Sequence, residues 1–378
     1  MKKYLSIFLP FLIVISVLST VWVSREAFLK KYDPNYWQSQ YENSEWAKGW
    51  DAPVTIGDAD LYAYAGWRQI NGDDPTKINP EMPPLGKYFL GLSILIFNNQ
   101  NLPSLFFGLV LLMLTYLISK AVLGEGWLKF VPVFLLSYDT LFRENLSISM
   151  LDMPLAAFTA LAFYFLILAQ KKPRLYFLAA ASLGAVASTK MYLAGFALTG
   201  AVFAYLLIIS FLFRRKNVLW FLISIPAFLL VYFGSYSIYF LKGHNLLDFK
   251  YLHFWVRHFA RVDVTNYPQF EIFRILLLGR WKTWWGGSGI VSANVWNPLW
   301  TAGLLVAFFV AYFGLKEKKH NVLLLIVWIF SYLAMYSVGV PYPRYLLPIL
   351  PAIYIILIFG VEKLSSLSKW KYLKNIKT

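Results

Sequence analysis

Residues 191–212 read MYLAGFALTGAVFAYLLIISFL, a run without one charged side chain. Such a run predicts a helix that crosses a bilayer, because about 20 apolar residues span the hydrocarbon core and a helix satisfies its own backbone hydrogen bonds there. Comparable runs recur along the chain, although the one at 127–138 is short for a span. The runs lie at 4–23, 101–123, 127–138, 152–169, 174–189, 191–212, 217–241, 298–315, 320–338 and 343–362. The sequence therefore predicts an all-α polytopic membrane protein with about ten transmembrane helices.

The composition fits a membrane protein better than a soluble one. Hydrophobic residues make up 59% of the 378 positions and charged residues 14%, whereas soluble domains are roughly half apolar and a quarter charged. Cysteine is absent, which excludes disulfides and thiolate metal sites. The net charge of +16 lies mostly in short loops and the C-terminal tail, where it indicates orientation in the membrane and no nucleic-acid partner.

Basic residues between the apolar runs predict the topology. Clusters at 171–174, 214–216 and 316–319 fall on the same side as Lys2 and Lys3 if the chain crosses ten times, and such clusters stay in the cytoplasm. The first run is longer than the apolar part of a signal peptide, so we expect an uncleaved span. Both termini are then cytoplasmic. The loops at 24–100, 139–151 and 242–297 face outside, and within the first of them the short apolar segment at 88–97 predicts an interfacial helix.

Two acidic motifs stand in the first outer loop. Asp58-Ala59-Asp60 brings together two carboxylates that suit a divalent cation or a general base, although a solvated pair is the simpler interpretation. The second motif is Asn79-Pro80-Glu81-Met82-Pro83-Pro84-Leu85-Gly86-Lys87. Its prolines favour a helix start that holds Glu81 and Lys87 at the membrane surface. There the lysine either suits a lipid phosphate or merely flanks the helix.

Further charged residues stand at the outer ends of predicted spans. They are Arg143, Asp152, Lys190 and Arg344. Each of these residues has a purely structural explanation. Asp152 complements a helix N-terminus, and Lys190 and Arg344 are long basic side chains that snorkel to the interface. Arg143 is part of an interfacial ion pair. The functional alternative is that Lys87, Lys190 and Arg344 together bind a phosphate. Asp152 would then mark the same site, because an acid at the hydrocarbon boundary is costly.

In their order, these motifs resemble the C superfamily of membrane glycosyltransferases (GT-C), in particular the protein O-mannosyltransferase branch that includes the lipid A aminoarabinose transferases. The matching elements are Asp58-Ala59-Asp60 with Tyr62, Glu81 before Pro83-Pro84-Leu85-Gly86-Lys87, Leu151-Asp152-Met153-Pro154, Ser188-Thr189-Lys190 and Arg344-Tyr345. The resemblance covers most of residues 1–215, which would form a GT-C-like membrane module with its acidic loop at 24–100. It is looser over 216–378, which would supply C-terminal helices and the outer loop at 242–297.

The resemblance implies that a sugar, mannose or another hexose, moves with inversion from a polyprenyl- or dolichyl-phosphate donor in the membrane lipid. The acceptor would be a hydroxyl of a protein Ser or Thr, or of a glycolipid, on the outer face. Asp58 and Asp60 would be catalytic, with Asp58 preferred as the base. The residues implied in binding donor phosphate or substrate are Glu81, Lys87, Arg143, Asp152, Lys190 and Arg344. No cofactor is required by the sequence. A divalent cation on Asp58, Asp60 and Glu81 stays an open alternative, as does a transporter or flippase of lipid-linked sugars.

Overall fold

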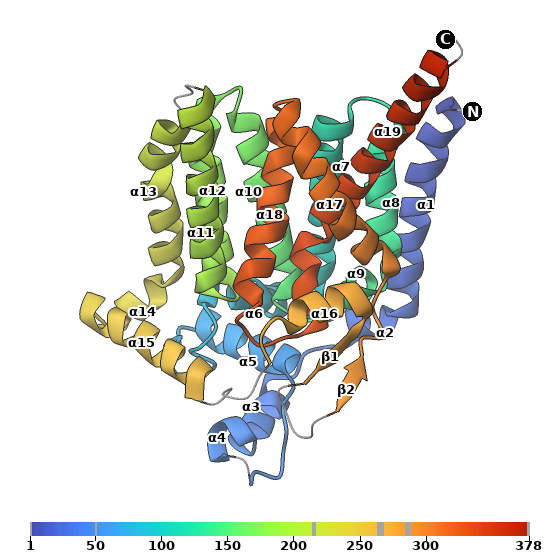
Figure 1. Cartoon of the computed structure of the whole chain (residues 1–378). Coiled ribbons are helices and arrows are strands. Elements are labelled where there is room, and N and C mark those ends of the chain that lie inside the picture. Colours follow the sequence, from blue (N-terminus) through green and yellow to red (C-terminus); the bar gives the residue numbers. More distant parts are fainter. Residues whose placement is uncertain (1, 50, 214–216, 263–267, 284–288, 376–378) are drawn as a thin grey trace.

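The computed structural model describes residues 2–49, 51–213, 217–262, 268–283 and 289–375, most of them helical (Figure 1). Seven helical segments in these ranges are long and apolar enough to cross a membrane. They are α1 (Lys2–Val23), α7 (Leu102–Leu123), α10 (Asp152–Ala169), α12 (Tyr192–Phe213), α13 (Asn217–Ser235), α17 (Pro298–Lys316) and α19 (Leu350–Asn375) with the preceding η3 (Pro343–Ile349). The predicted all-α polytopic membrane fold is confirmed.

Three of the ten predicted spans form shorter helices that run beside the long ones (Figure 1). They are α8 (Val131–Tyr138) after η1 (Trp127–Phe130), α11 (Tyr176–Thr189) after η2 (Pro173–Leu175), and α18 (His320–Tyr336). α11 packs against α10, α12 and α13, and most of its side chains are buried. A short helix is tolerated at membrane depth when protein rather than lipid surrounds it.

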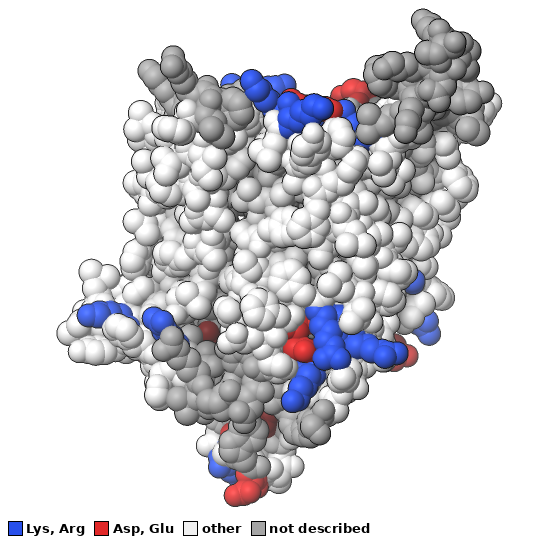
Figure 2. Space-filling view, viewed as in Figure 1, with Lys and Arg blue, Asp and Glu red and all other residues white. Residues whose placement is uncertain are grey.

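Charged side chains gather at the two ends of the molecule and leave an uncharged belt between them on the visible face (Figure 2). Apolar side chains on the helices are exposed at this depth. On α1, for example, Ile7, Phe11 and Leu18 are all more than half exposed. Continuous apolar surface of this kind is unfavourable in water, so the belt is the surface that faces lipid.

Smaller elements cover one end of the bundle, which we call the loop end (Figure 1). They are α2 (Arg25–Leu29), α3 (Pro34–Glu42), α4 (Glu45–Lys48), α5 (Asp58–Ile70), α6 (Pro84–Phe97), α9 (Thr140–Asn145), α14 (Ser237–Leu241), α15 (Leu246–Val262), α16 (Glu271–Leu278) and the antiparallel strands β1 (Arg280–Lys282) and β2 (Ile290–Ser292). α1 begins and α19 ends at the opposite end (Figure 1). All three predicted outer loops therefore share one end of the molecule.

α5 and α6 pack closely because glycines face each other. A Cβ on Gly66 would lie 2.1 Å from the backbone oxygen of Lys87, and one on Gly91 would lie 2.2 Å from the oxygen of Gly66. At the start of α6, a Cβ on Gly86 would lie 2.8 Å from the backbone oxygen of Thr189. The α5–α6 pair is thereby held against the C-terminal end of α11.

The main hydrophobic core draws on both halves of the chain. Phe163 of α10 stacks on Trp328 of α18 with ring centroids 4.7 Å apart, and both side chains are fully buried. The core thus joins helices from both sides of the boundary expected after residue 215. The basic cluster at 214–216 lies outside the described residues.

Candidate active site

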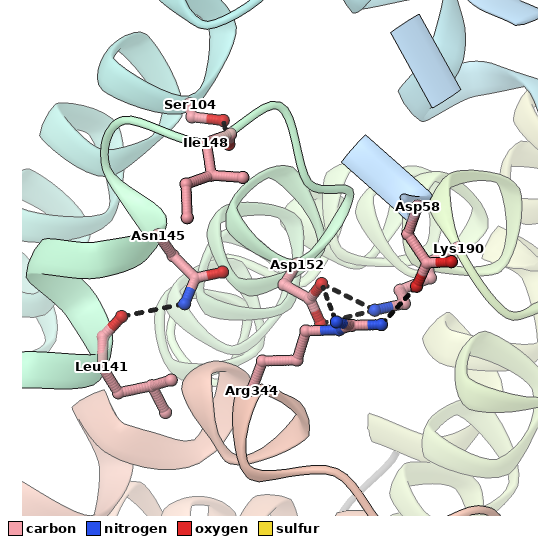
Figure 3. Close-up of polar contacts among 8 residues, drawn as sticks. All are labelled: Asp58, Ser104, Leu141, Asn145, Ile148, Asp152, Lys190 and Arg344. Atoms are coloured by element: carbon pink, nitrogen blue, oxygen red, sulfur yellow. Dashed lines mark hydrogen bonds and ion pairs between the residues drawn. The ribbon is translucent and has the colours of Figure 1, made fainter. Parts of the chain in front are cut away.

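Four charged side chains from distant parts of the chain meet at the loop end (Figure 3). Lys190 Nζ lies 2.6 Å from each carboxylate oxygen of Asp152. Arg344 Nη2 lies 2.5 Å from Asp58 Oδ2, and its Nε lies 3.6 Å from Asp152 Oδ2. Asp58, Arg344, Asp152 and Lys190 therefore form one continuous series of ion pairs with balanced charge, which we call the charge cluster.

Each member of the charge cluster stands at or next to a helix end. Asp58 opens α5 and Asp152 opens α10, where free N–H groups and the helix dipole favour a carboxylate. Lys190 follows the last residue of α11, where a cation is favoured, and Arg344 lies in η3. The ends converge because α6 packs on both α5 and α11, while α10 packs on both α11 and η3.

Exposure increases along the charge cluster. The side chains of Asp152 and Lys190 are 0% and 3% exposed, that of Arg344 is 14% exposed and that of Asp58 is 38% exposed. A charge removed from water costs several kcal/mol unless it is paired. Asp152 and Lys190 therefore depend on each other, while Asp58 is the member that a substrate can reach from outside.

Tyrosine rings enclose the two cations. The guanidinium carbon of Arg344 lies 4.1 Å from the centre of the Tyr342 ring, and Lys190 Nζ lies 4.4 Å from that of Tyr345. Aromatic faces attract cations. Within the described part of the chain, the Nε of Arg344 is buried and makes no hydrogen bond, although it faces the carboxylate of Asp152 at 3.6 Å. Tyr342 was not among the predicted site residues, although its place beside Arg344 in the sequence was an available signal.

Glu81 and Lys87 form a second charged group beside the charge cluster. The side chain of Lys87 is fully buried, and its Nζ donates to the backbone oxygen of Asn79 at 2.7 Å. The Asn79 amide in turn donates to Glu81. Burial lowers the pKa of Lys87. Burial also raises the pKa of Glu81, and the negative charge of Asp58 adds to that rise. No hydrogen bond or ion pair among the described residues joins Lys87 to the charge cluster.

Asp60 points to different partners from those of Asp58. Gln100 Nε2 donates to Asp60 Oδ1 at 2.8 Å and to Ser149 Oγ at 3.0 Å, which ties α5 to the segments before α7 and α10. Where the chain is described, no three His, Cys, Asp or Glu side chains are arranged to hold a metal ion. Asp58, Asp60 and Glu81, the residues considered for a cation, are therefore not grouped as three ligands in this structure.

Arg143 lies apart from the charge cluster. Its Nε donates to Thr20 Oγ1 at 2.8 Å, so it joins α9 to α1.

Sequence reasoning missed the neighbouring carboxylate of Asp139, which is 1% exposed and accepts hydrogen bonds from Trp300 at 2.8 Å and Tyr354 at 2.5 Å. Its position just before a helix start was the only local signal, because those partners lie 161 and 215 residues further along.

An apolar groove begins two residues from Lys190, between α12, α13 and α15. Its volume is about 510 Å³. The residues that line it are Tyr192, Phe196, Leu229, Tyr232, Phe233, Phe249, Lys250, His253, Phe254 and Arg257. Apart from Lys250, His253 and Arg257, this wall is aromatic or aliphatic. The groove therefore suits an extended apolar chain with a negative group at one end.

The chain is similar to known proteins in sequence over one segment and in fold over nearly its whole length. Residues 81–236 match the model of the dolichyl-phosphate-mannose-protein mannosyltransferase family. This segment contains Lys87, Asp152 and Lys190. Among solved structures, ArnT from Cupriavidus metallidurans bound to undecaprenyl phosphate is similar with a TM-score of 0.62 at 16% identity, over 97% of this chain and 62% of that chain. The fold is that of the GT-C glycosyltransferases. The resemblance predicted from the sequence is confirmed.

Two other GT-C structures are from Archaeoglobus fulgidus. The oligosaccharyltransferase AglB in complex with an inhibitory peptide and a dolichol-phosphate has a TM-score of 0.58 at 15% identity, over 99% of this chain and 52% of that chain. The oligosaccharyltransferase in complex with Zn and sulfate has a TM-score of 0.55 at 14% identity, over 97% and 51%. None of the curated proteins matches this chain in sequence. The chain spans 62% of the ArnT chain and about half of the oligosaccharyltransferase chains.

Proposed function

We propose that this GT-C protein transfers a hexose from a polyprenyl-phosphate donor to an acceptor hydroxyl at the loop end. The observation that carries the proposal is the charge cluster, in which the accessible carboxylate of Asp58 is paired with the cation of Arg344. Transfer of a sugar from a phosphate needs both charges, since a base must take the acceptor proton and a cation must stabilise the leaving phosphate. The bound undecaprenyl phosphate of ArnT and dolichol-phosphate of AglB support this choice of donor.

In the proposed reaction, the acceptor oxygen attacks the anomeric carbon of the sugar on the face opposite the phosphate. Its proton passes to a carboxylate oxygen of Asp58. The bond from the anomeric carbon to the phosphate oxygen breaks, and that oxygen keeps the electron pair. The polyprenyl phosphate leaves with one more negative charge, which Arg344 and Lys190 stabilise. Attack opposite the leaving group inverts the anomeric configuration.

Arg344 has to release Asp58 before this step, because the guanidinium occupies the carboxylate oxygen that would face the acceptor hydroxyl. The donor phosphate competes for the same guanidinium, which binds phosphate as well as carboxylate. We therefore expect the donor to bind before the acceptor and to free Asp58 as it binds. Asp152 keeps Lys190 in place throughout.

The apolar groove provides a place for the polyprenyl chain. It is lined by Tyr192, two residues from Lys190 along the chain, and its cations Lys250 and Arg257 stand on α15 at the loop end. The name of the matching family favours mannose as the sugar, with a protein Ser or Thr or a glycolipid as acceptor. The basic clusters expected in the cytoplasm favour the outer face for the loop end. The members of the charge cluster stand at or next to helix ends, whereas a transporter needs charge at mid-bilayer depth, which favours the transferase.

The test is transfer from a polyprenyl-phosphate [¹⁴C]mannose by the full chain in nanodiscs, with a Ser/Thr-rich peptide and a membrane lipid extract as acceptors. Asp58→Asn should lower the rate by at least about 10²-fold, the usual contribution of a general base. Asp60→Asn should keep most of the activity, because Asp60 bonds Gln100. If Asp60→Asn abolished transfer and Asp58→Asn kept it, Asp58 would not be the base. If the protein moved the donor across liposome membranes without transferring the sugar, it would not be a transferase.

A further inference from the structure

A second cavity lies among α2, α3 and the segment that leads into α7. The helices α2 and α3 are part of the loop end (Figure 1). Its volume is about 160 Å³. The residues that line it are Ala27, Lys30, Lys31, Tyr32, Trp37, Gln100 and Asn101. We call it the α2–α3 pocket. None of its residues belongs to the charge cluster.

The walls of the α2–α3 pocket are fixed to each other by Asn99, which is 3% exposed. Its amide nitrogen lies 2.9–3.0 Å from three backbone oxygens at the end of α2, the last of them that of Lys30. Its side-chain oxygen accepts from the backbone N–H of Asn101 at 2.8 Å. Tyr32 adds a backbone hydrogen bond to Asn98 at 2.9 Å. The pocket is therefore built in advance, which lowers the entropy cost of binding a ligand.

The lining combines the groups that recognise a sugar bearing a negative charge. Trp37 offers an aromatic face, and its ring stacks on that of Tyr32 with centroids 6.4 Å apart. Gln100 adds a polar amide to the same wall. Lys30 and Lys31 are exposed, and neither forms an ion pair with another described residue. Their ammonium groups are therefore available for a carboxylate or a phosphate.

Tyr32 forms part of the pocket wall and is 6% exposed. Its buried hydroxyl has no hydrogen-bond partner in the part of the chain that the structure describes. A buried polar group left unpaired costs about 1–3 kcal/mol, so this wall contains an unsatisfied polar group. The cavity of about 160 Å³ admits one pyranose ring.

We propose that the α2–α3 pocket binds one saccharide unit that carries a carboxylate or a phosphate. It is separate from the charge cluster. Gln100, one of its lining residues, donates to Asp60 in the first turn of α5. An acidic glycan in the pocket would thus lie next to the helix that carries the proposed base, on the side of Asp60. Binding is a property of the resting protein and does not depend on the proposed transferase reaction.

The test is saturation-transfer NMR on the full chain in nanodiscs, with glucuronate and glucose as observed ligands and inorganic phosphate, which has no carbon-bound proton to observe, as a competitor of glucuronate. Glucuronate should bind, and more tightly than glucose. The double variant Lys30→Gln/Lys31→Gln should weaken it about tenfold or more, because it removes both charge-assisted contacts. Lys48→Gln/Lys77→Gln removes two exposed lysines from the same outer loop and should leave the affinity unchanged. Asp58→Asn should also bind glucuronate as the wild type does.

Three results would overturn the proposal. Equal weakening in the two lysine double variants would mean that general positive charge, and not the pocket, attracts the ligand. Inorganic phosphate that binds as tightly as glucuronate would mean an anion site without sugar recognition. Loss of glucuronate binding in Asp58→Asn would place the sugar at the charge cluster. A protein without transfer activity could still be tested for glucuronate binding in the same way. The transferase proposal and the pocket proposal can therefore be refuted independently of each other.

Discussion

The buried pair of Asp152 and Lys190 allows a quantitative test of the charge cluster. Asp152→Asn keeps the shape of the side chain and leaves Lys190 and Arg344 with Asp58 as the one acid of the cluster. Lys190→Met keeps much of the side-chain volume and removes the opposite charge. In that variant, however, Asp152 still has Arg344 Nε at 3.6 Å. The geometry therefore predicts that the loss of Asp152 costs more stability than the loss of Lys190.

The magnitudes follow from the distances and the burial. At an effective dielectric constant of about 20, the contact between Asp152 and Lys190 at 2.6 Å is worth about 6 kcal/mol before desolvation, and the contact between Asp152 and Arg344 at 3.6 Å about 5 kcal/mol. Removing one partner of a buried pair typically costs about 3–5 kcal/mol. We expect about 5 kcal/mol for Asp152→Asn, which loses both contacts, and about 3 kcal/mol for Lys190→Met.

The assay is denaturant unfolding of the full chain in detergent, followed by tryptophan fluorescence. The double variant Asp152→Asn/Lys190→Met keeps the balanced pair of Asp58 and Arg344, so its cost should fall below the sum of the single costs by about 2–3 kcal/mol. Lys120→Met is the control. It breaks an ion pair with Glu125 in which both side chains are solvent-exposed, and it should leave the stability unchanged.

Two results would refute this reasoning. Additive costs in the double variant would mean that Asp152 and Lys190 do not interact in the folded protein. A larger cost for Lys190→Met than for Asp152→Asn would mean that Arg344 does not share Asp152.

Two more predictions concern the α5–α6 pair. Burial lowers the pKa of Lys87 from its usual 10.5, so between the two values the unfolded chain binds more protons than the folded chain and stability rises with pH. Lys87→Met should abolish this rise above neutral pH in thermal unfolding, and an unchanged slope would contradict it. Gly66→Ala should cost about 1–3 kcal/mol, because its Cβ would lie 2.1 Å from the Lys87 oxygen. Gly200→Ala, which meets nothing within 4 Å, is the control in the same unfolding assay, and equal stability of the two variants would show that α5 and α6 do not pack in this way.

The sequence predicted the helices better than it predicted their lengths. The long runs became α1, α7, α10, α12, α13, α17 and α19 with η3. The run at 217–241 ends early, because α13 stops at Ser235 and α14 continues as a separate helix. The run at 174–189 gave α11, whose 14 residues are shorter than a lipid-exposed span. Hydropathy shows which residues avoid water, but not whether lipid or protein surrounds them.

The sequence predicted which charged residues stand at the same end of the spans. It did not predict which of them pair with each other. Asp58 and Asp60 lie two positions apart, which turns them about 200° apart on a helix. From the sequence, either could face the cations. The partner of Asp58 is Arg344, 286 residues further along, while Asp60 bonds Gln100. Arg143 looked equivalent to the other outer cations, but it bonds Thr20 on α1.

The sequence by itself determined that this is a multi-pass α-helical membrane protein with acids and bases at the ends of its spans. It could do so because the bilayer imposes a length and a hydrogen-bonding pattern that each segment must satisfy locally. Only the tertiary structure decided which of those charges share a site. Charge pairing acts through space between helix ends far apart in sequence, and it depends on contacts such as Gly66 on Lys87 and Gly86 on Thr189, which no periodicity of the chain encodes.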